Sequence, residues 1–83
     1  MSDILLVDDE KSVRLTLALF LKKKGYRVDE ASNGEEAIEM VKEHFYDLVI
    51  TDLKMKPVDG MEVLQKIKSI NPMIEVIVMT AYG

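Results

Sequence analysis

The chain has 83 residues, of which 48% are hydrophobic and 31% are charged, a size and composition typical of one small globular domain. Eleven Lys and Arg residues against 15 Asp and Glu residues give a net charge of −4, which argues against direct binding of nucleic acid. Cysteine is absent, which excludes disulfides and thiolate metal sites. We find neither a signal-peptide pattern nor an apolar stretch of membrane-spanning length, and we expect a cytoplasmic protein without a membrane partner.

Strand and helix patterns alternate along the chain. Short apolar runs bounded by turn signals predict strands, and apolar residues at helical spacing predict helices. Three lysines followed by Gly25 indicate the end of the first helix, because cations suit a helix C-terminus and glycine readily adopts positive φ. We expect strands at residues 4–7, 27–31, 48–52 and 74–79, and helices at residues 11–24, 35–43 and 61–70.

The predicted order is βαβαβαβ, which places the chain in the α/β class. Alternation of strands and helices at this spacing implies right-handed crossovers and a parallel sheet with helices on both faces. The half-polar strand at residues 27–31 is typical of a sheet edge. The first helix is expected to present an apolar face formed by Val13, Leu15, Leu17, Ala18, Phe20 and Leu21.

Polar residues follow or end three of the four predicted strands. Asp8 and Asp9 follow the first strand, Asp52 ends the third, and Thr80 follows the fourth. Parallel strands share one direction, so these side chains are expected to converge at one edge of the sheet. In open α/β sheets this carboxyl edge is where ligands bind.

Three carboxylates without a partnering His or Cys favour a hard divalent cation, above all Mg²⁺. Close carboxylates raise one another's pKa unless a cation balances them. Beside such an ion, Asp52 could act as a nucleophile toward a phosphoryl group, and the Thr80 hydroxyl could donate to a phosphoryl oxygen.

Local structural roles are an alternative for each of these residues. Asp52 could stabilise the loop that follows its strand, and Thr80 could bond a nearby backbone group. Asp8 and Asp9 could cap the first helix, a role that does not exclude metal binding.

Three segments resemble the receiver domain of two-component response regulators. They are the acidic pair within residues 4–10, the D-x-x-M…D-G pattern within residues 48–60, and the Thr-Ala pair within residues 76–83. The resemblance covers the whole chain and implies the flavodoxin-like doubly wound fold, here with strand order 2-1-3-4. The ending at residues 79–83 is similar to that of the σ54-dependent activator group.

The resemblance also implies a role for each site residue. Asp52 would accept a phosphoryl group from a sensor histidine kinase and switch an output. Asp9, Asp52 and the backbone carbonyl of Lys54 would ligate Mg²⁺ directly, and Asp8 would act through metal-bound water. Thr80 would be the switch hydroxyl. Such a domain is not an enzyme beyond catalysing its own phosphorylation and dephosphorylation.

The chain departs from the family pattern at two places. Lys56 stands where the family usually has proline, and Pro57 follows it. A full receiver continues through a fourth helix, a fifth strand that carries a lysine, and a fifth helix. Residues 1–83 are therefore expected to be the N-terminal two-thirds of a receiver, with phosphoryl transfer slowed or lost without that lysine.

An incomplete sheet has consequences for assembly. The strand at residues 74–79 would be an exposed, strongly β-prone edge, so we expect a homo-oligomer formed through it. The alternative function is thus a phosphorylation-impaired fragment that acts as an oligomerisation or interaction module. A phosphatase of the aspartyl-nucleophile class is disfavoured because the pair Asp8-Asp9 lacks the D-x-D spacing, and nucleotide binding is disfavoured because no Gly-rich loop follows the first strand.

Overall fold

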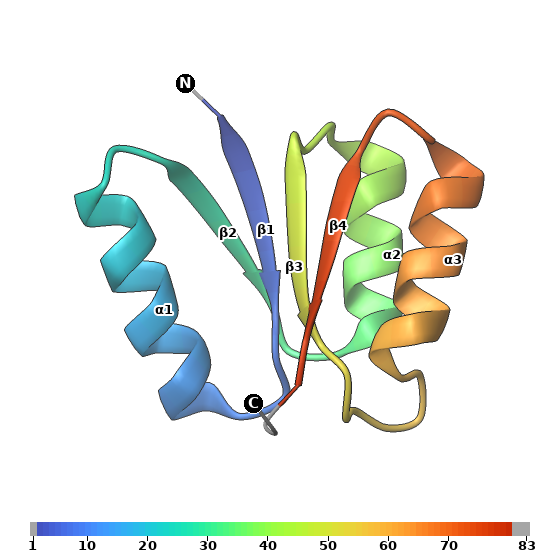
Figure 1. The fold of residues 1–83 in the computed structure, drawn as a ribbon, viewed down its shortest axis with the longest axis horizontal. Coiled ribbons are helices and arrows are strands. Elements are labelled where there is room, and N and C mark those ends of the chain that lie inside the picture. The colour runs from blue at the N-terminus through green and yellow to red at the C-terminus, as the bar shows by residue number, and fades with distance from the viewer. Residues whose placement is uncertain (1, 81–83) are drawn as a thin grey trace.

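The computed structural model describes residues 2–80 of the chain. Every expected element is present, with ends within one residue of the prediction. The third segment of the receiver resemblance includes residues 81–83, which lie outside the described residues. The strands are β1 (Asp3–Val7), β2 (Arg27–Ala31), β3 (Leu48–Asp52) and β4 (Glu75–Met79), and the helices are α1 (Lys11–Lys23), α2 (Gly34–Glu43) and α3 (Gly60–Ile70) (Figure 1).

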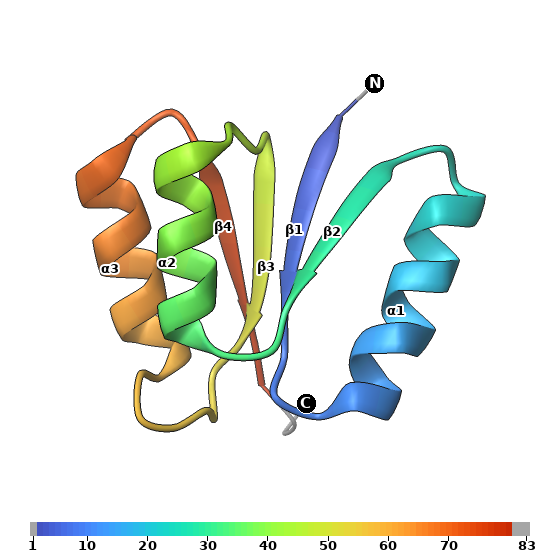
Figure 2. The same ribbon diagram turned by 180° about the vertical axis from the view of Figure 1, so that it is seen from behind.

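The strands form one parallel sheet in the order β2-β1-β3-β4, which confirms the predicted topology. Helix α1 lies on one face of the sheet, and α2 and α3 lie side by side on the other (Figures 1 and 2). The carboxyl ends of all four strands point toward the same end of the molecule. Across residues 2–80, no helix combines the length and apolar character needed to span a membrane.

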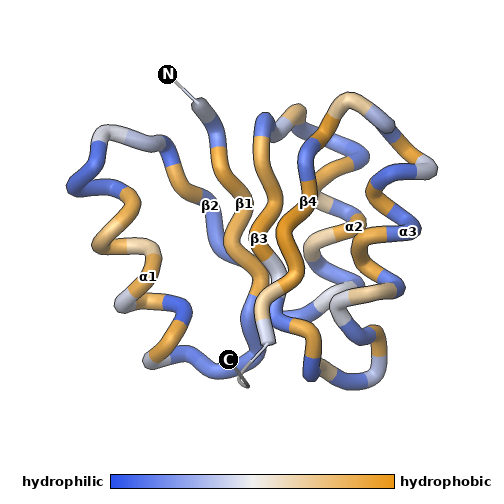
Figure 3. Tube along the Cα trace, viewed as in Figure 1, coloured by the Kyte–Doolittle hydropathy of each residue, from blue (hydrophilic) through white to orange (hydrophobic). Residues whose placement is uncertain are grey.

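The main core lies between the sheet and the helices α2 and α3. The central strands β1 and β3 are apolar along their middle, as Figure 3 shows. Side chains alternate between the two faces of a strand, so Leu5 and Val7 of β1 and Val49 of β3 enter this core. Its buried members are Leu5, Val7, Ala31, Ala37, Val41, Tyr46, Val49, Met55, Val63, Ile67 and Ile74.

The helix ends follow the expected chemistry in three places. Asn33 caps α2, because its side chain accepts a hydrogen bond of 2.8 Å from the Glu36 amide. Asp59 caps α3 in the same way, with a hydrogen bond of 2.9 Å from the Glu62 amide. Gly25 follows α1 with φ of 97°, as expected for a glycine that ends a helix. These caps fix where α2 and α3 begin relative to the strand ends.

The predicted apolar face of α1 is only partly buried. Ala18 is the one residue of α1 that is fully buried, whereas Phe20 is 56% exposed and Leu15 is 42% exposed. Helix α1 packs against β1 and β2 through a narrow stripe, and within residues 2–80 no further element covers the rest of that face. Helical spacing therefore identified the helix correctly but not how much of its surface is covered.

Candidate metal centre

The strand register brings the acidic residues together. In the pairing of β1 with β3, Val7 is opposite Thr51, so Asp8 and Asp52 come next on neighbouring strands at the same level. Val7 points into the core beneath α2 and α3, and by alternation Asp8 and Asp52 lie on the opposite face, beside α1. The predicted convergence of the first and third strand ends is confirmed.

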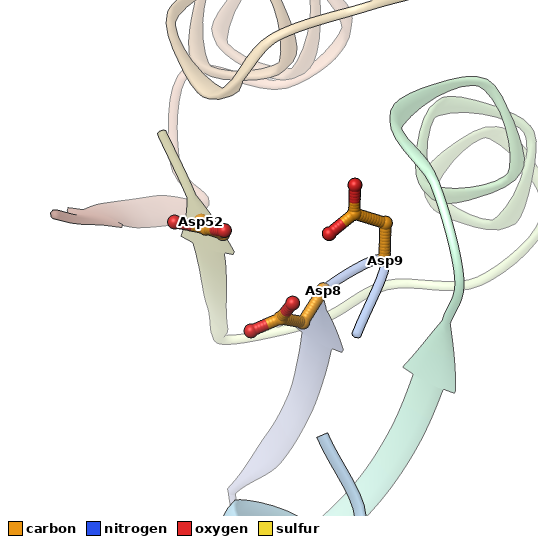
Figure 4. A group of neighbouring side chains, drawn as sticks. All are labelled: Asp8, Asp9 and Asp52. Carbon is orange, nitrogen blue, oxygen red and sulfur yellow. The ribbon is translucent and has the colours of Figure 1, made fainter. Parts of the chain in front are cut away.

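Asp8, Asp9 and Asp52 form the one group of metal-ligand type within residues 2–80. Each offers one carboxylate oxygen, and these atoms all lie within 4.8 Å of one another. Figure 4 shows the Asp8 and Asp9 side chains, at the end of β1, on the same side as the tip of β3 that carries Asp52. We call these three residues the acidic cluster. Asp8 is buried, Asp52 is half-buried and Asp9 is exposed, so the cluster opens to solvent on the Asp9 side.

The Asp8 carboxylate has an unfavourable electrostatic environment. Burial raises the pKa of Asp8 above its ordinary value, and the negative charges of Asp52, Asp9 and Glu10 raise that pKa further. The Glu10 amide opposes these effects by donating a hydrogen bond of 2.9 Å to Asp8 Oδ1. A bound cation would stabilise the ionised form that burial disfavours.

Neither carboxylate of the acidic pair caps helix α1. Helix α1 has Glu10 at its N-cap position, and no side chain caps the helix there. Asp8 instead closes a tight turn before the helix begins. The capping alternative is therefore wrong. The Asp9 carboxylate instead lies close to the carboxylates of Asp8 and Asp52 (Figure 4).

The fourth strand brings Thr80 to the same place. Asp52 pairs with Met79, and the amide of Leu53 donates to the Met79 carbonyl at 2.7 Å, so Thr80 follows at the strand ends. Asp52 and Thr80 share a cavity of about 250 Å³ between the sheet and α1. It is lined by Asp8, Glu10, Val13, Leu17, Asp52, Met79 and Thr80.

A second depression, of about 500 Å³, lies on the Asp9 side of the acidic cluster. It is formed by the loop that follows β3, and Lys54 and Lys56 both line it. The buried side chain of Met55 anchors this loop to the core. Lys54 thus lines the same depression as Asp9, and its backbone carbonyl is the group predicted to ligate Mg²⁺. The Lys56–Pro57 peptide of the same loop is cis.

Gly60 is a site residue whose role the sequence pattern did not reveal. Its amide donates to the Leu53 carbonyl at 3.0 Å, which brings the start of α3 against the end of β3. A Cβ atom at Gly60 would lie 2.8 Å from Leu53 Cα and would collide with the Asp52 carbonyl oxygen. Only glycine allows this approach. The available signals were the D-G pair of the D-x-x-M…D-G pattern and its place before an expected helix, neither of which indicates the neighbour of Gly60.

Arg14 is the second residue that sequence reasoning missed. Its side chain donates to the Asp8 carbonyl and pairs with Glu30 on β2. No local pattern could have identified it, because Glu30 lies on the next strand and the Asp8 carbonyl belongs to the backbone.

The donor set fits Mg²⁺. All three side chains of the acidic cluster offer carboxylate oxygens, which Mg²⁺ prefers, and no His or Cys contributes to the cluster. Such an ion keeps several of its waters and binds through only one or two carboxylates, which suits a cluster with one exposed side.

Comparison with known proteins identifies a family. The family model for the response regulator receiver domain matches residues 4–83. The transcriptional regulatory protein ZraR of Klebsiella oxytoca is 49% identical over 81 residues, which are 98% of this chain and 18% of ZraR. Sporulation initiation phosphotransferase F of Bacillus subtilis is 42% identical over 80 residues, which are 96% of this chain and 64% of that protein. The chain thus spans less than two-thirds of either relative.

Solved structures agree with the family match. The response regulator TrrA of Thermotoga maritima, in complex with Mg²⁺ and a beryllium fluoride, superposes with a TM-score of 0.95 at 41% identity, covering 100% of this chain and 72% of TrrA. TrrA in complex with the histidine kinase ThkA gives a TM-score of 0.92 with the same identity and coverage. A receiver domain protein of Clostridium thermocellum gives 0.94 at 35% identity, covering 100% of this chain and 68% of that one.

Proposed function

The chain belongs to the response regulator receiver domain family, and we propose that it accepts a phosphoryl group on Asp52 from a sensor histidine kinase. The observation that carries this proposal is the acidic cluster, whose three oxygen atoms lie within 4.8 Å at the carboxyl edge of a parallel sheet. The solved complex of TrrA with a histidine kinase supports a kinase as the partner.

In the proposed step, a carboxylate oxygen of Asp52 attacks the phosphorus atom of a phosphohistidine. A phosphorus–oxygen bond forms, the phosphorus–nitrogen bond breaks, and its electron pair leaves on the imidazole nitrogen, giving an acyl phosphate on Asp52. Asp52 is half-buried at the edge of the 250 Å³ cavity, so its carboxylate is accessible while the strand fixes its direction.

Asp9, Asp52 and the backbone carbonyl of Lys54 would hold Mg²⁺, with Asp8 acting through a water molecule. The ion supplies neutralisation of the charge on the transferring group. The Thr80 hydroxyl, in the same cavity as Asp52, would donate to a phosphoryl oxygen and move with it, which makes Thr80 the switch residue. The chain is a signalling module, and the chemistry proposed for it is limited to its own phosphorylation and dephosphorylation.

The test is labelling with a small acyl phosphate in the presence of Mg²⁺, followed by intact-mass spectrometry. We expect labelling of the unaltered chain by a single phosphoryl group, at whatever rate, and none in Asp52→Asn. Asp59→Asn is the matched control: it makes the same chemical change a few residues along the chain, and asparagine still caps α3. Equal labelling of Asp52→Asn, or no labelling of the unaltered chain, would contradict the proposal.

A second candidate function is that of an interaction module. Strand β4 lies at the sheet edge, and its Ile77 is 50% exposed, so the strand can pair with a second copy. We propose a homo-oligomer through β4.

The remaining assignments are also proposals. The net charge of −4 disfavours nucleic-acid binding by this segment itself. Similarity to the transcriptional regulator ZraR fits the resemblance to the σ54-dependent activator group. We also propose a cytoplasmic location, as expected from the sequence.

A further inference from the structure

Arg14, on the first turns of α1, makes two polar contacts that join three elements. Its Nη1 atom donates to the backbone carbonyl of Asp8 at 2.7 Å. Its Nε atom lies 3.1 Å from Glu30 Oε1, in an ion pair whose side chains are only 13% and 25% exposed. The guanidinium thus connects α1, the end of β1 and the edge strand β2.

The backbone around the Asp8 carbonyl is held from two further directions. The Asp8 amide donates to the Ala31 carbonyl of β2 at 3.2 Å, and the Arg14 amide donates to the Glu10 carbonyl at 3.0 Å. The Arg14 side chain therefore holds one end of the segment that carries Asp8 and Asp9, and the first backbone hydrogen bond of α1 holds the other. A displacement of this segment would move both carboxylates relative to Asp52.

We infer that Arg14 is a positioning residue for the acidic cluster, acting through the Asp8 backbone to set the affinity for a divalent cation. The inference rests on the proposed function, since it requires the cluster to bind Mg²⁺. Arginine suits the role because its planar fork offers divergent donors, one for Glu30 and one for the carbonyl. The single ammonium group of lysine does not match this geometry.

Electrostatics and positioning predict opposite results when Arg14 is replaced by a neutral residue. Removing a cation beside three carboxylates would by Coulomb's law alone strengthen Mg²⁺ binding. Losing the hydrogen bond that orients Asp8 and Asp9 would weaken it, as happens when the outer partners of metal ligands are lost. The sign of the change in affinity thus separates the two effects.

The experiment is calorimetric titration of Mg²⁺ into the unaltered chain and into Arg14→Gln. We expect Arg14→Gln to weaken Mg²⁺ binding by about tenfold, the lower end of what such outer partners contribute. Lys42→Gln is the control with the same charge change, because Lys42 forms an exposed pair with Glu39 on α2, remote from the cluster. It should leave the affinity unchanged. Glu30→Gln retains an acceptor for Nε and should change the affinity by less than Arg14→Gln does.

Unfolding by urea, followed by circular dichroism, accompanies each titration. A purely structural role would lower stability and leave the Mg²⁺ affinity of the folded chain unchanged. If Arg14→Gln binds Mg²⁺ as tightly as the unaltered chain or more tightly, the inference about Arg14 is overturned and the proposed function is not. No binding by the unaltered chain would contradict the proposed function as well. If Arg14→Gln does not fold, Arg14→Lys takes its place: weaker binding than in the unaltered chain supports the inference, and equal binding overturns it.

Discussion

Among single residues, Asp8 holds a charge that the fold disfavours. Burial and the neighbouring carboxylates raise the pKa of Asp8 in the folded chain. Over the range between its ordinary and its raised pKa, the unfolded chain has lost this proton while the folded chain retains it. The contribution of Asp8 to stability is therefore fully present below the ordinary aspartate pKa and is lost as pH rises through the raised value.

Replacing Asp8 by asparagine removes this penalty. The side-chain carbonyl oxygen of the new asparagine would still accept the hydrogen bond from the Glu10 amide, so the turn is retained. We expect Asp8→Asn to be more stable at neutral pH by about 1 kcal/mol, the usual gain from relieving one unfavourable site. Urea unfolding across pH without divalent ions measures this, and Mg²⁺ should narrow the difference. A destabilised Asp8→Asn at neutral pH would be inconsistent with the buried, repelled carboxylate.

Gly60 tests whether close backbone contact positions Asp52. In Gly60→Ala the new methyl group would collide with the Asp52 carbonyl oxygen and lie 2.8 Å from Leu53 Cα, so the end of β3 must shift. We expect Gly60→Ala to lower the free energy of unfolding by about 2 kcal/mol, a change typical of overpacking, and to abolish phosphoryl labelling.

Gly25→Ala is the control for this substitution. Its φ of 97° makes any side chain unfavourable there, but no atom lies within 4 Å of the added carbon. Gly25→Ala should lower the free energy of unfolding by about 1 kcal/mol through backbone strain and leave phosphoryl labelling intact. Labelling of Gly60→Ala at the rate of the unaltered chain would show that the contact does not position Asp52.

Among the secondary-structure elements, β4 is the one best suited to pair with a second copy of the chain. It is the edge strand opposite β2, and four apolar residues follow Glu75 in it. By alternation its Ile77 lies on the face of the sheet that α1 only partly covers, where it is 50% exposed. We expect the chain to self-associate in sedimentation experiments, and we expect Ile77→Lys to shift it toward the monomer.

Met73→Lys is the matched control for this prediction. Met73 is 77% exposed, but it precedes β4 and takes no part in the sheet. It should leave the association unchanged. A compact monomer for the unaltered chain at high concentration would contradict association through β4.

At the element level, prediction from sequence succeeded where the signals are local. Apolar runs and turn residues placed all seven elements to within one residue. The degree of burial was harder to predict, because it depends on what covers a surface. Phe20 follows the helical period of α1 and is nevertheless 56% exposed, whereas Tyr46, in the segment between α2 and β3, is 2% exposed in the core. The Tyr46 hydroxyl donates to Asp29 of β2 at 2.6 Å, a partner 17 residues away in sequence.

For the molecule as a whole, parallel strand direction explains how the site is assembled. Asp8, Asp9, Asp52 and Thr80 were predicted together because one direction brings all strand ends to one edge, and the structure places them there. Arg14 and Gly60 were not predicted, because their roles arise from contacts with backbone atoms distant in sequence. The residues expected to perform the chemistry thus follow from the topology, whereas the residues that orient them require coordinates.

The central claim is that Asp8, Asp9 and Asp52 share one divalent cation. The most direct measurement replaces Mg²⁺ by paramagnetic Mn²⁺ and follows line broadening of the backbone amides by NMR. We predict that the amides of Asp8, Asp9, Asp52 and the loop after β3 broaden first, and that excess Mg²⁺ restores them. Broadening that begins instead at the exposed acidic residues of α2, or that spreads evenly over the surface, would contradict the account.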